Sequence, residues 1–342
     1  MGTSAALAQA VVAGDRRALS RAITLVESSR SDHRDLAAAL LEAVQPHTGQ
    51  AVRLGVSGPP GAGKSTFIQA YGLRLVDGQQ QRVAVLAVDP TSTQSGGSIL
   101  GDKTRMGDLA SRDAAFIRPS PTSGSVGGIA RRTREVLLLC EAAGFDHVVV
   151  ETVGVGQSET AVAGIVDTMA LLLSPAAGDD LQGIKRGVME LADVVVATKG
   201  DGDLLPAART AAADARQGLA LLRRRHPGWD PPVLLVSALH DEGIDPVIDA
   251  VAAHRTHLVE QGQLQPLRRQ QDVGWLMAEV TDGLLRAFRA DPQAAAALDS
   301  ALDDVRAGQT TPSAASRRLL RDFLHDRARP DPGSAVPGPH RR

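Results

Sequence analysis

The sequence predicts an α/β fold in which a mostly parallel sheet is covered by helices on both faces. Short runs rich in β-branched residues alternate with helical segments from about Ala51 onward, as in successive βαβ crossovers. A glycine-rich loop follows the first of these runs. After about Gln261 the strand pattern stops and only helical periodicity continues. We therefore expect one α/β domain with helical additions at both ends.

The first part of the chain has helical periodicity. Apolar residues recur at helical spacing between Ser4 and Val44, which predicts two or three short helices. Pro46 and Gly49 punctuate helices and mark the expected boundary. We expect an N-terminal helical extension over residues 1–48.

Seven runs are expected to form the strands of the sheet. They are residues 52–56, 83–88, 115–117, 147–150, 169–173, 194–197 and 233–236. In an open parallel sheet, ligands bind at the carboxyl ends of the strands. Residues 49–262 are thus expected to form the α/β domain, with its ligand site at the carboxyl ends of the strands.

An amphipathic helix is expected after the last strand. Its apolar stripe consists of Val273, Met277, Val280, Leu284 and Phe288. The stripe suits packing against the sheet domain and suits a homodimer interface equally well. Two more helical segments are expected near residues 294–305 and 312–324, within a helical region over residues 263–328. The tail over residues 329–342 is rich in proline and glycine and is expected to be disordered.

Composition excludes several classes of protein. A net charge of -2 and an aromatic content of 2% argue against binding to nucleic acid. The single cysteine, Cys140, lies in an apolar run and is expected to be a buried small hydrophobe in a reducing compartment. No secretory signal and no membrane-spanning run are recognised, so we expect no membrane association and a cytoplasmic location.

Residues 58–66 fill every fixed position of the phosphate-binding pattern G-x-x-x-x-G-K-[ST]. In such a loop, backbone amides and the helix that follows surround the phosphates. Lys64 is expected to reach the β- and γ-phosphates, and Ser65 to offer its hydroxyl to a bridging Mg²⁺. The residues expected to bind the nucleotide here are Gly58, Pro59, Gly61, Ala62, Gly63, Lys64, Ser65 and Thr66.

Two later strand ends predict recognition of guanine. Residues 198–201 resemble the motif [NT]-K-x-D, in which Asp201 accepts hydrogen bonds from the base and the stem of Lys199 lies along it. Thr198 stands where Asn is commoner. After the next strand, Ser237, Ala238 and Leu239 are expected near the guanine O6.

The predicted metal side of the site lies between these motifs. Glu151 ends an apolar strand, with Gly154 three residues further on, which is the layout of a Mg²⁺-side element followed by a switch. Residues 89–92 and 96–106 form a polar, glycine-rich stretch typical of a mobile switch. Gln157 is a candidate for positioning the attacking water.

These segments, above all residues 151–159 and 179–187, resemble the MeaB/ArgK group of GTPases, the G-protein chaperones of cobalamin-dependent acyl-CoA mutases. The resemblance spans residues 23 to 262 and implies a P-loop NTPase fold with a C-terminal helical dimerisation arm. It also implies GTP or GDP as ligand, Mg²⁺ as cofactor, a mutase partner and a homodimer. The implied catalytic residues are Lys64, Glu151 and Gln157, and the implied metal ligands are Ser65, Asp89, Asp102 and Glu151. The implied switch toward the partner contains Asp179, Asp180, Gln182 and Lys185.

Together, the nucleotide motifs and this resemblance imply a Mg²⁺-dependent GTPase that gates cofactor loading on methylmalonyl-CoA mutase or a relative, and that protects or reactivates the mutase. One alternative is a nickel-insertion chaperone, which would need clustered Cys and His residues. Cys140 stands alone, and His254 and His257 are expected to be a surface pair. The other alternative is an ATP-dependent kinase linked to amino-acid transport.

Overall fold

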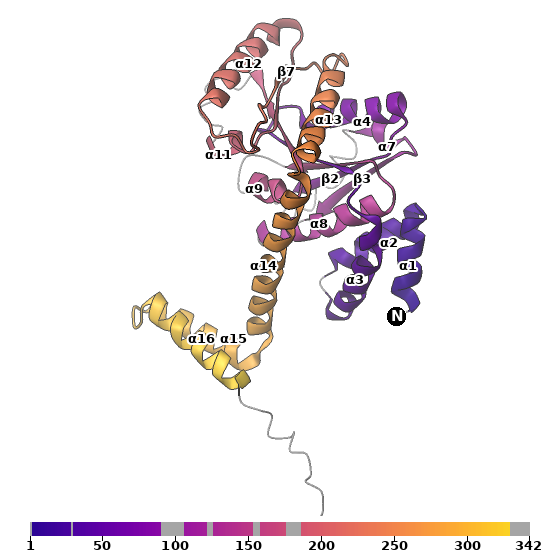
Figure 1. Ribbon diagram of the computed structural model, residues 1–342. Helices are drawn as coiled ribbons and strands as arrows, with labels where there is room; N and C mark the ends of the chain where they lie inside the picture. Colours follow the sequence, from indigo (N-terminus) through magenta and orange to yellow (C-terminus); the bar gives the residue numbers. More distant parts are fainter. Residues whose placement is uncertain are drawn as a thin grey trace, which may run out of the picture. The chain divides into compact units, whose positions relative to one another are not determined.

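Seven parallel strands form one sheet in the first of two structural units, residues 1–275 (Figure 1). The computed structural model describes residues 2–28, 30–89, 106–121, 126–152, 158–175 and 186–328. The strands are β1 (Val52–Ser57), β2 (Val83–Asp89), β3 (Ala115–Pro121), β4 (His147–Thr152), β5 (Thr168–Leu173), β6 (Val194–Ala197) and β7 (Val233–Leu235). Their order is β3-β2-β4-β1-β5-β6-β7, and each neighbouring pair is parallel. The predicted fold and its seven strands are confirmed.

Helices flank this sheet and precede it. Before β1 lie α1 (Gly2–Val12), α2 (Arg16–Glu27), α3 (Ser31–Val44) and the 3₁₀ helix η1 (Gln45–His47). Between strands lie α4 (Lys64–Leu73), the π-helix η2 (Arg74–Gly78), α7 (Gly107–Ala110), α8 (Val126–Ala142), α9 (Ser158–Ala163), α11 (Arg186–Met189), the 3₁₀ helix η4 (Gly202–Leu204) and α12 (Leu205–Ala220). After β7 come α13 (Ile244–Glu260) and α14 (Leu264–Ala290). Three α-helices precede the sheet, where the sequence predicted two or three.

The central strands are buried on both faces, which explains their continuous apolar runs. Val148 and Val150 of β4 lie in the core shared with α8 and the N-terminal helices, whereas Val149 between them packs in the core with α4 and α13. Cys140 of α8 is fully buried in the first core, as predicted. Burial raises the pKa of its thiol, so the thiol stays protonated at neutral pH.

A buried ion pair joins β1 to α8. Arg53 donates from Nε and Nη2 to the two carboxylate oxygens of Glu141 over 2.8 and 2.9 Å, and both side chains are almost fully buried. The backbone amide of Gly49 donates to the same carboxylate over 2.8 Å. Burial alone would lower the pKa of Arg53, but the bonds to Glu141 hold it above its usual value. Glu141 thereby fixes the entry to β1 from the preceding helices.

The second unit, residues 276–342, is helical in its described part. It contains the end of α14, together with α15 (Pro292–Arg306) and α16 (Pro312–Ala328), as the sequence predicts. Phe288 and Phe323 meet edge to face, with ring centroids 5.0 Å apart. Residues 329–342, the expected disordered tail, lie outside the described residues. Over the part of the chain that the structure describes, no helix is long and apolar enough to cross a membrane.

We expect the substitution Glu141→Ala to lower the free energy of unfolding by about 3–5 kcal/mol, because it leaves the buried Arg53 guanidinium without its counter-ion. Chemical denaturation followed by circular dichroism measures this difference. The matched control is Asp32→Ala, which breaks the fully exposed pair with Arg30 and should change stability little. Equal effects of the two substitutions would contradict a structural role for the buried pair.

Candidate functional site

The loop between β1 and α4 has the backbone geometry of a phosphate-binding loop. Gly58 has φ +154°, and a Cβ atom there would lie 2.5 Å from the carbonyl oxygen of Leu172 in β5. Gly61 and Gly63 have φ +77° and +81°, values that favour glycine. α4 begins immediately afterwards, at Lys64. The glycines of the motif thus allow the loop both its left-handed turns and its close contact with β5.

Lys64 lies over this loop. Its Nζ donates to the carbonyl oxygens of Gly58 and Pro59 over 2.8 and 3.1 Å. Burial lowers the pKa of Lys64, while the carboxylates of Glu151 and Glu159 act in the opposite direction. Glu159, fully buried at the start of α9, is not among the residues predicted for the site. The sequence signal for it is its position at the end of the segment that carries the family resemblance.

Glu151 and Ser65 come together as predicted for a metal side. Parallel pairing of β1 with β4 sets Val56 opposite Glu151, so the carboxylate emerges beside the loop. Ser65 Oγ donates to Glu151 Oε1 over 3.1 Å, and Glu151 is 4% exposed. Adjacent oxygen ligands of an octahedral Mg²⁺, with bonds of about 2.0–2.1 Å, lie about 3 Å apart. The oxygen donors and their spacing therefore fit Mg²⁺.

Thr198 links the predicted base-binding turn to the phosphate loop. Its Oγ1 lies 2.8 Å from the carbonyl oxygen of Ala62 in the loop and 2.9 Å from that of Leu173 at the end of β5. The side chain is 3% exposed. The hydroxyl stands in place of the commoner Asn amide and has one proton to donate, either to the loop or to the end of β5. Its contact with Ala62 joins the base-binding turn to the phosphate loop.

The turn at residues 198–201 is also joined to the segment after β7. Ser237 Oγ donates to the carboxylate of Asp201, and Gly200 N donates to Val236 O over 2.9 Å. Lys199 has φ +54°, and the side chains of Lys199 and Asp201 are both partly exposed. The two segments predicted to read guanine, distant in sequence, thus form one hydrogen-bonded unit.

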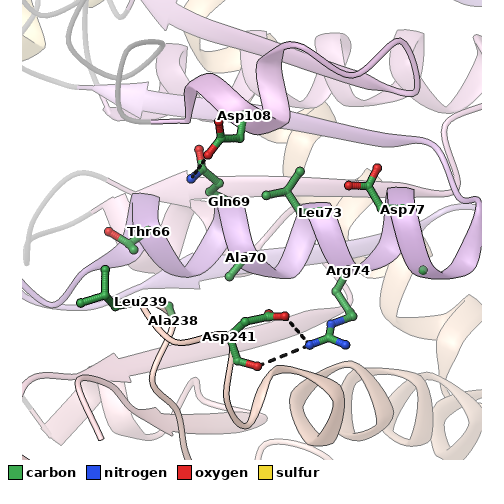
Figure 2. A pocket seen from close by; sticks show the side chains of 11 residues that line it. Thr66, Gln69, Ala70, Leu73, Arg74, Asp77, Asp108, Ala238, Leu239 and Asp241 are labelled. Carbon is green, nitrogen blue, oxygen red and sulfur yellow. Dashed lines mark hydrogen bonds and ion pairs between the residues drawn. The ribbon is translucent and has the colours of Figure 1, made fainter. Parts of the chain in front are cut away.

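An open cavity of about 700 Å³ lies along α4 (Figure 2). Thr66, in the first turn of α4, lines one end of it together with Ala238 and Leu239 of the predicted base-binding segment. At the other end, Arg74 of η2 forms an ion pair with Asp241. The cavity therefore adjoins both predicted parts of the nucleotide site.

Several predicted site residues lie beyond what the structure describes. These are Asp102, Gln157, Asp179, Asp180, Gln182 and Lys185. Asp89 ends β2, at the same edge of the sheet as Glu151, but its side chain is outside the description. Within the described residues, the phosphate loop, Glu151 near the end of β4 and the two base-side segments all lie at the carboxyl edge of the sheet.

The chain is similar to known proteins over most of its length. The model of a family described as "Methylmalonyl Co-A mutase-associated GTPase MeaB" matches residues 19–293. The chain is 51% identical over 272 residues to "GTPase ArgK" of Escherichia coli, covering 80% of this chain and 82% of that one. It is 45% identical over 326 residues to "Methylmalonic aciduria type A homolog, mitochondrial" of Mus musculus, covering 92% of this chain and 78% of that one. A solved structure titled "Crystal structure of LAO/AO transport system kinase" is similar with a TM-score of 0.75 and 40% identity, over 95% of this chain and 98% of that one.

We expect the substitution Thr198→Val to weaken the binding of GDP roughly fivefold, because it removes a buried hydrogen bond worth about 1 kcal/mol between the base-side turn and the loop. Titration with a fluorescent GDP analogue measures the dissociation constant. The matched control Thr198→Ser keeps the hydroxyl and should bind GDP nearly as well as the unaltered protein. Equal affinity of the Val and Ser variants would rule out this link.

Proposed function

We propose that this chain, which belongs to the MeaB family of methylmalonyl Co-A mutase-associated GTPases, hydrolyses GTP and acts as a chaperone of a cobalamin-dependent acyl-CoA mutase. In this proposal the GTPase gates loading of the cobalamin cofactor and protects or reactivates the mutase. The observation that carries the proposal is the combination of the family match with a phosphate loop whose lysine and serine lie beside a buried acid.

The described residues suit phosphoryl transfer, which depends mainly on positioning and on neutralising charge. We assign Lys64 to the β- and γ-phosphates, because its ammonium group already lies over the loop carbonyls. Ser65 and Glu151 would hold Mg²⁺, which would neutralise charge between the same phosphates. Asp89 and Asp102 remain predicted contributors on the metal side, and Gln157 remains the candidate for orienting water.

The base side favours guanine over adenine. The carboxylate of Asp201 would accept hydrogen bonds from the N1–H and amino groups of guanine, an arrangement that adenine does not offer. Ser237 donates to that carboxylate and so supports its orientation. This preference supports a GTPase rather than an ATP-dependent transport kinase.

We also propose that α14 pairs with α14 of a second copy of this chain. Four residues of its predicted stripe are 47–61% exposed, namely Val273, Met277, Val280 and Leu284. Their spacing of four, three and four residues is that of a coiled-coil seam. Only Phe288, at the end of the stripe, is buried. A symmetric partner would cover the exposed part of the stripe.

Turnover of GTP tests the proposed activity. We expect slow hydrolysis by the purified chain alone and faster hydrolysis when a cobalamin-dependent acyl-CoA mutase is added, because a partner can complete such a site. The substitution Lys64→Ala should lower turnover on the order of 100-fold, as the loss of a preorganised donor does. Phosphate release, with ATP as a parallel substrate, measures both effects.

The outcomes separate activity from partner. If the mutase does not change the rate of GTP hydrolysis, the mutase is rejected as the partner but the GTPase activity stands. A preference for ATP would instead reject the proposed recognition of guanine. A variant lacking residues 178–187 tests the proposed switch with Asp179, Asp180, Gln182 and Lys185. Stimulation of this variant equal to that of the intact protein would reject the switch.

The double substitution Val280→Glu with Leu284→Glu should convert a dimer into a monomer, because it introduces charges into the apolar seam. Light scattering after size exclusion would then report a mass near 35.7 kDa instead of twice that value. The control Arg289→Glu changes charge about half a turn away from Val280 around the same helix and should leave the dimer intact. A monomeric unaltered chain would contradict the proposed pairing.

A further inference from the structure

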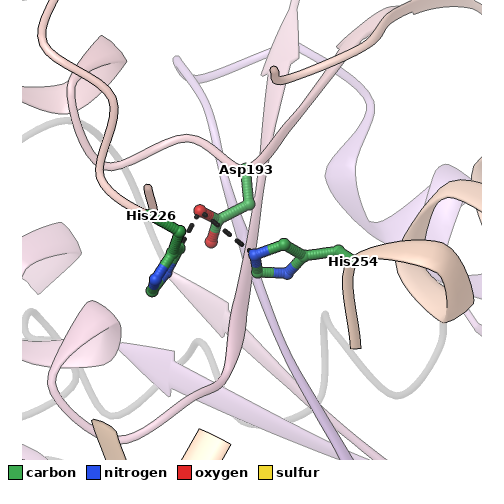
Figure 3. Close-up of side chains that lie close together, drawn as sticks. All are labelled: Asp193, His226 and His254. Carbon is green, nitrogen blue, oxygen red and sulfur yellow. Dashed lines mark ion pairs between the residues drawn. The ribbon is translucent and has the colours of Figure 1, made fainter. Parts of the chain in front are cut away.

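Three side chains that carry metal-ligand atoms meet at the edge of the sheet opposite to the nucleotide site (Figure 3). Asp193 immediately precedes β6, His226 lies between α12 and β7, and His254 lies on α13. The phosphate loop follows the carboxyl end of β1, whereas Asp193 lies at the amino end of a parallel strand. This cluster is therefore distinct from the predicted Mg²⁺ side.

The ligand atoms of the cluster are close together and shielded from water. Oδ1 of Asp193 lies 3.4 Å from Nε2 of His226 and 3.7 Å from Nε2 of His254. One ligand atom from each residue lies within 4.8 Å of the other two. The residues are 1%, 6% and 0% exposed, respectively. Among the residues that the structure describes, neither Nε2 atom has a hydrogen-bond partner, although buried polar atoms almost always have one.

Neighbouring groups leave these atoms facing one another. Oδ2 of Asp193 accepts from the backbone amide of Met169 and from Nη1 of Arg225, each over 2.8 Å. Nδ1 of His254 lies 2.8 Å from the hydroxyl oxygen of Thr168. Such outer contacts are the ones that orient carboxylate and histidine ligands at metal centres. The bonds from Met169 and Arg225 occupy Oδ2 of Asp193. They leave Oδ1 facing the Nε2 atoms of His226 and His254.

We propose that Asp193, His226 and His254 bind a divalent first-row transition metal ion, with Zn²⁺ as the expected occupant and water as a fourth ligand. Tetrahedral ligands with bonds of about 2.0–2.1 Å lie about 3.3–3.4 Å apart, close to the two observed separations. Imidazole ligands suit zinc and its neighbours, whereas Mg²⁺ and Ca²⁺ prefer oxygen ligands only. A metal ion would accept both lone pairs that hydrogen bonding leaves unused.

The protonation state of the histidines agrees with this assignment. Burial lowers the pKa of His226 to about 4 and that of His254 to about 3. Both rings are therefore uncharged at neutral pH, which is the form that ligates metals. The expectation of a surface pair is wrong for His254, which is fully buried, while Nε2 of His257 lies 3.0 Å from the carbonyl oxygen of Pro227.

A metal ion here would fasten three elements that border the base side of the nucleotide site. β6 carries Asp193 at its start and the turn with Thr198 at its end. Trp229, in the same connection as His226, donates from Nε1 to the backbone oxygen of Asp193 over 2.8 Å and packs its ring against His254. The role we infer for the metal is therefore structural, at a distance from the phosphates.

Metal binding by the full chain tests the proposal. The purified protein is stripped with a chelator and titrated with Co²⁺, whose visible absorption reports tetrahedral coordination, and Zn²⁺ affinity is then measured by competition. We expect one ion per chain and a higher melting temperature with Zn²⁺. His226→Gln should bind Zn²⁺ roughly 100-fold more weakly or worse, since loss of an outer-shell partner alone costs 10–100-fold. The control His47→Gln removes an exposed histidine and should bind as the unaltered chain does.

A second variant and a folding control show whether a loss of Zn²⁺ binding reflects the missing ligand or misfolding. His254→Gln should also lose the Zn²⁺-dependent rise in melting temperature, and retained GDP binding shows that either variant is folded. Zn²⁺ affinity of His226→Gln and His254→Gln equal to that of the unaltered chain would overturn the proposal. Failure of the unaltered chain to bind Zn²⁺ or Co²⁺ at micromolar concentration would overturn it as well.

Discussion

Parallel pairing of β1 with β4 is the constraint on which the phosphate side of the molecule depends. The register sets Val56 opposite Glu151, so the carboxylate reaches the edge of the sheet where α4 begins. A slip of one residue would turn Glu151 to the other face of the sheet and remove it from Ser65. On the other side of β1, the carbonyl of Leu172 in β5 comes so close that only glycine fits at position 58. The loop is therefore shaped by both neighbours of β1, not by its own sequence alone.

The sequence was sufficient for most of the fold because the strands are buried on both faces. Runs such as residues 147–150 and 194–197 are continuous and β-branched, so their boundaries agree closely with β4 and β6. The phosphate loop was equally predictable, since its motif encodes a local backbone shape. The length of the edge strand was harder to predict. The strand expected at residues 115–117 continues to Pro121 as β3, because pairing with β2 extends it.

Contacts between distant segments could not be read from the sequence. The hydroxyl of Thr198, which stands in place of the commoner Asn, lies beside the carbonyl of Ala62, a neighbour that no local pattern reveals. The carboxylate of Glu159, on a separate helix, acts to raise the pKa of Lys64 against the effect of burial. Asp193, His226 and His254 are far apart along the chain and match no metal-ligand spacing, so no sequence motif marks them. Only the folded sheet brings these three together.

α13 contacts the strands of the base side at both of their ends, the carboxyl end and the amino end. At the carboxyl edge, a Cβ atom on Gly243 would lie 2.3 Å from the carbonyl oxygen of Leu235, so the start of the helix presses onto the end of β7. Ser237 and Glu242 exchange backbone hydrogen bonds of 3.0 Å at the same point. At the amino edge, His254 packs beside Asp193 at the start of β6. α13 therefore connects the turn after β7 to the amino end of β6, because the helix contacts the sheet at both places.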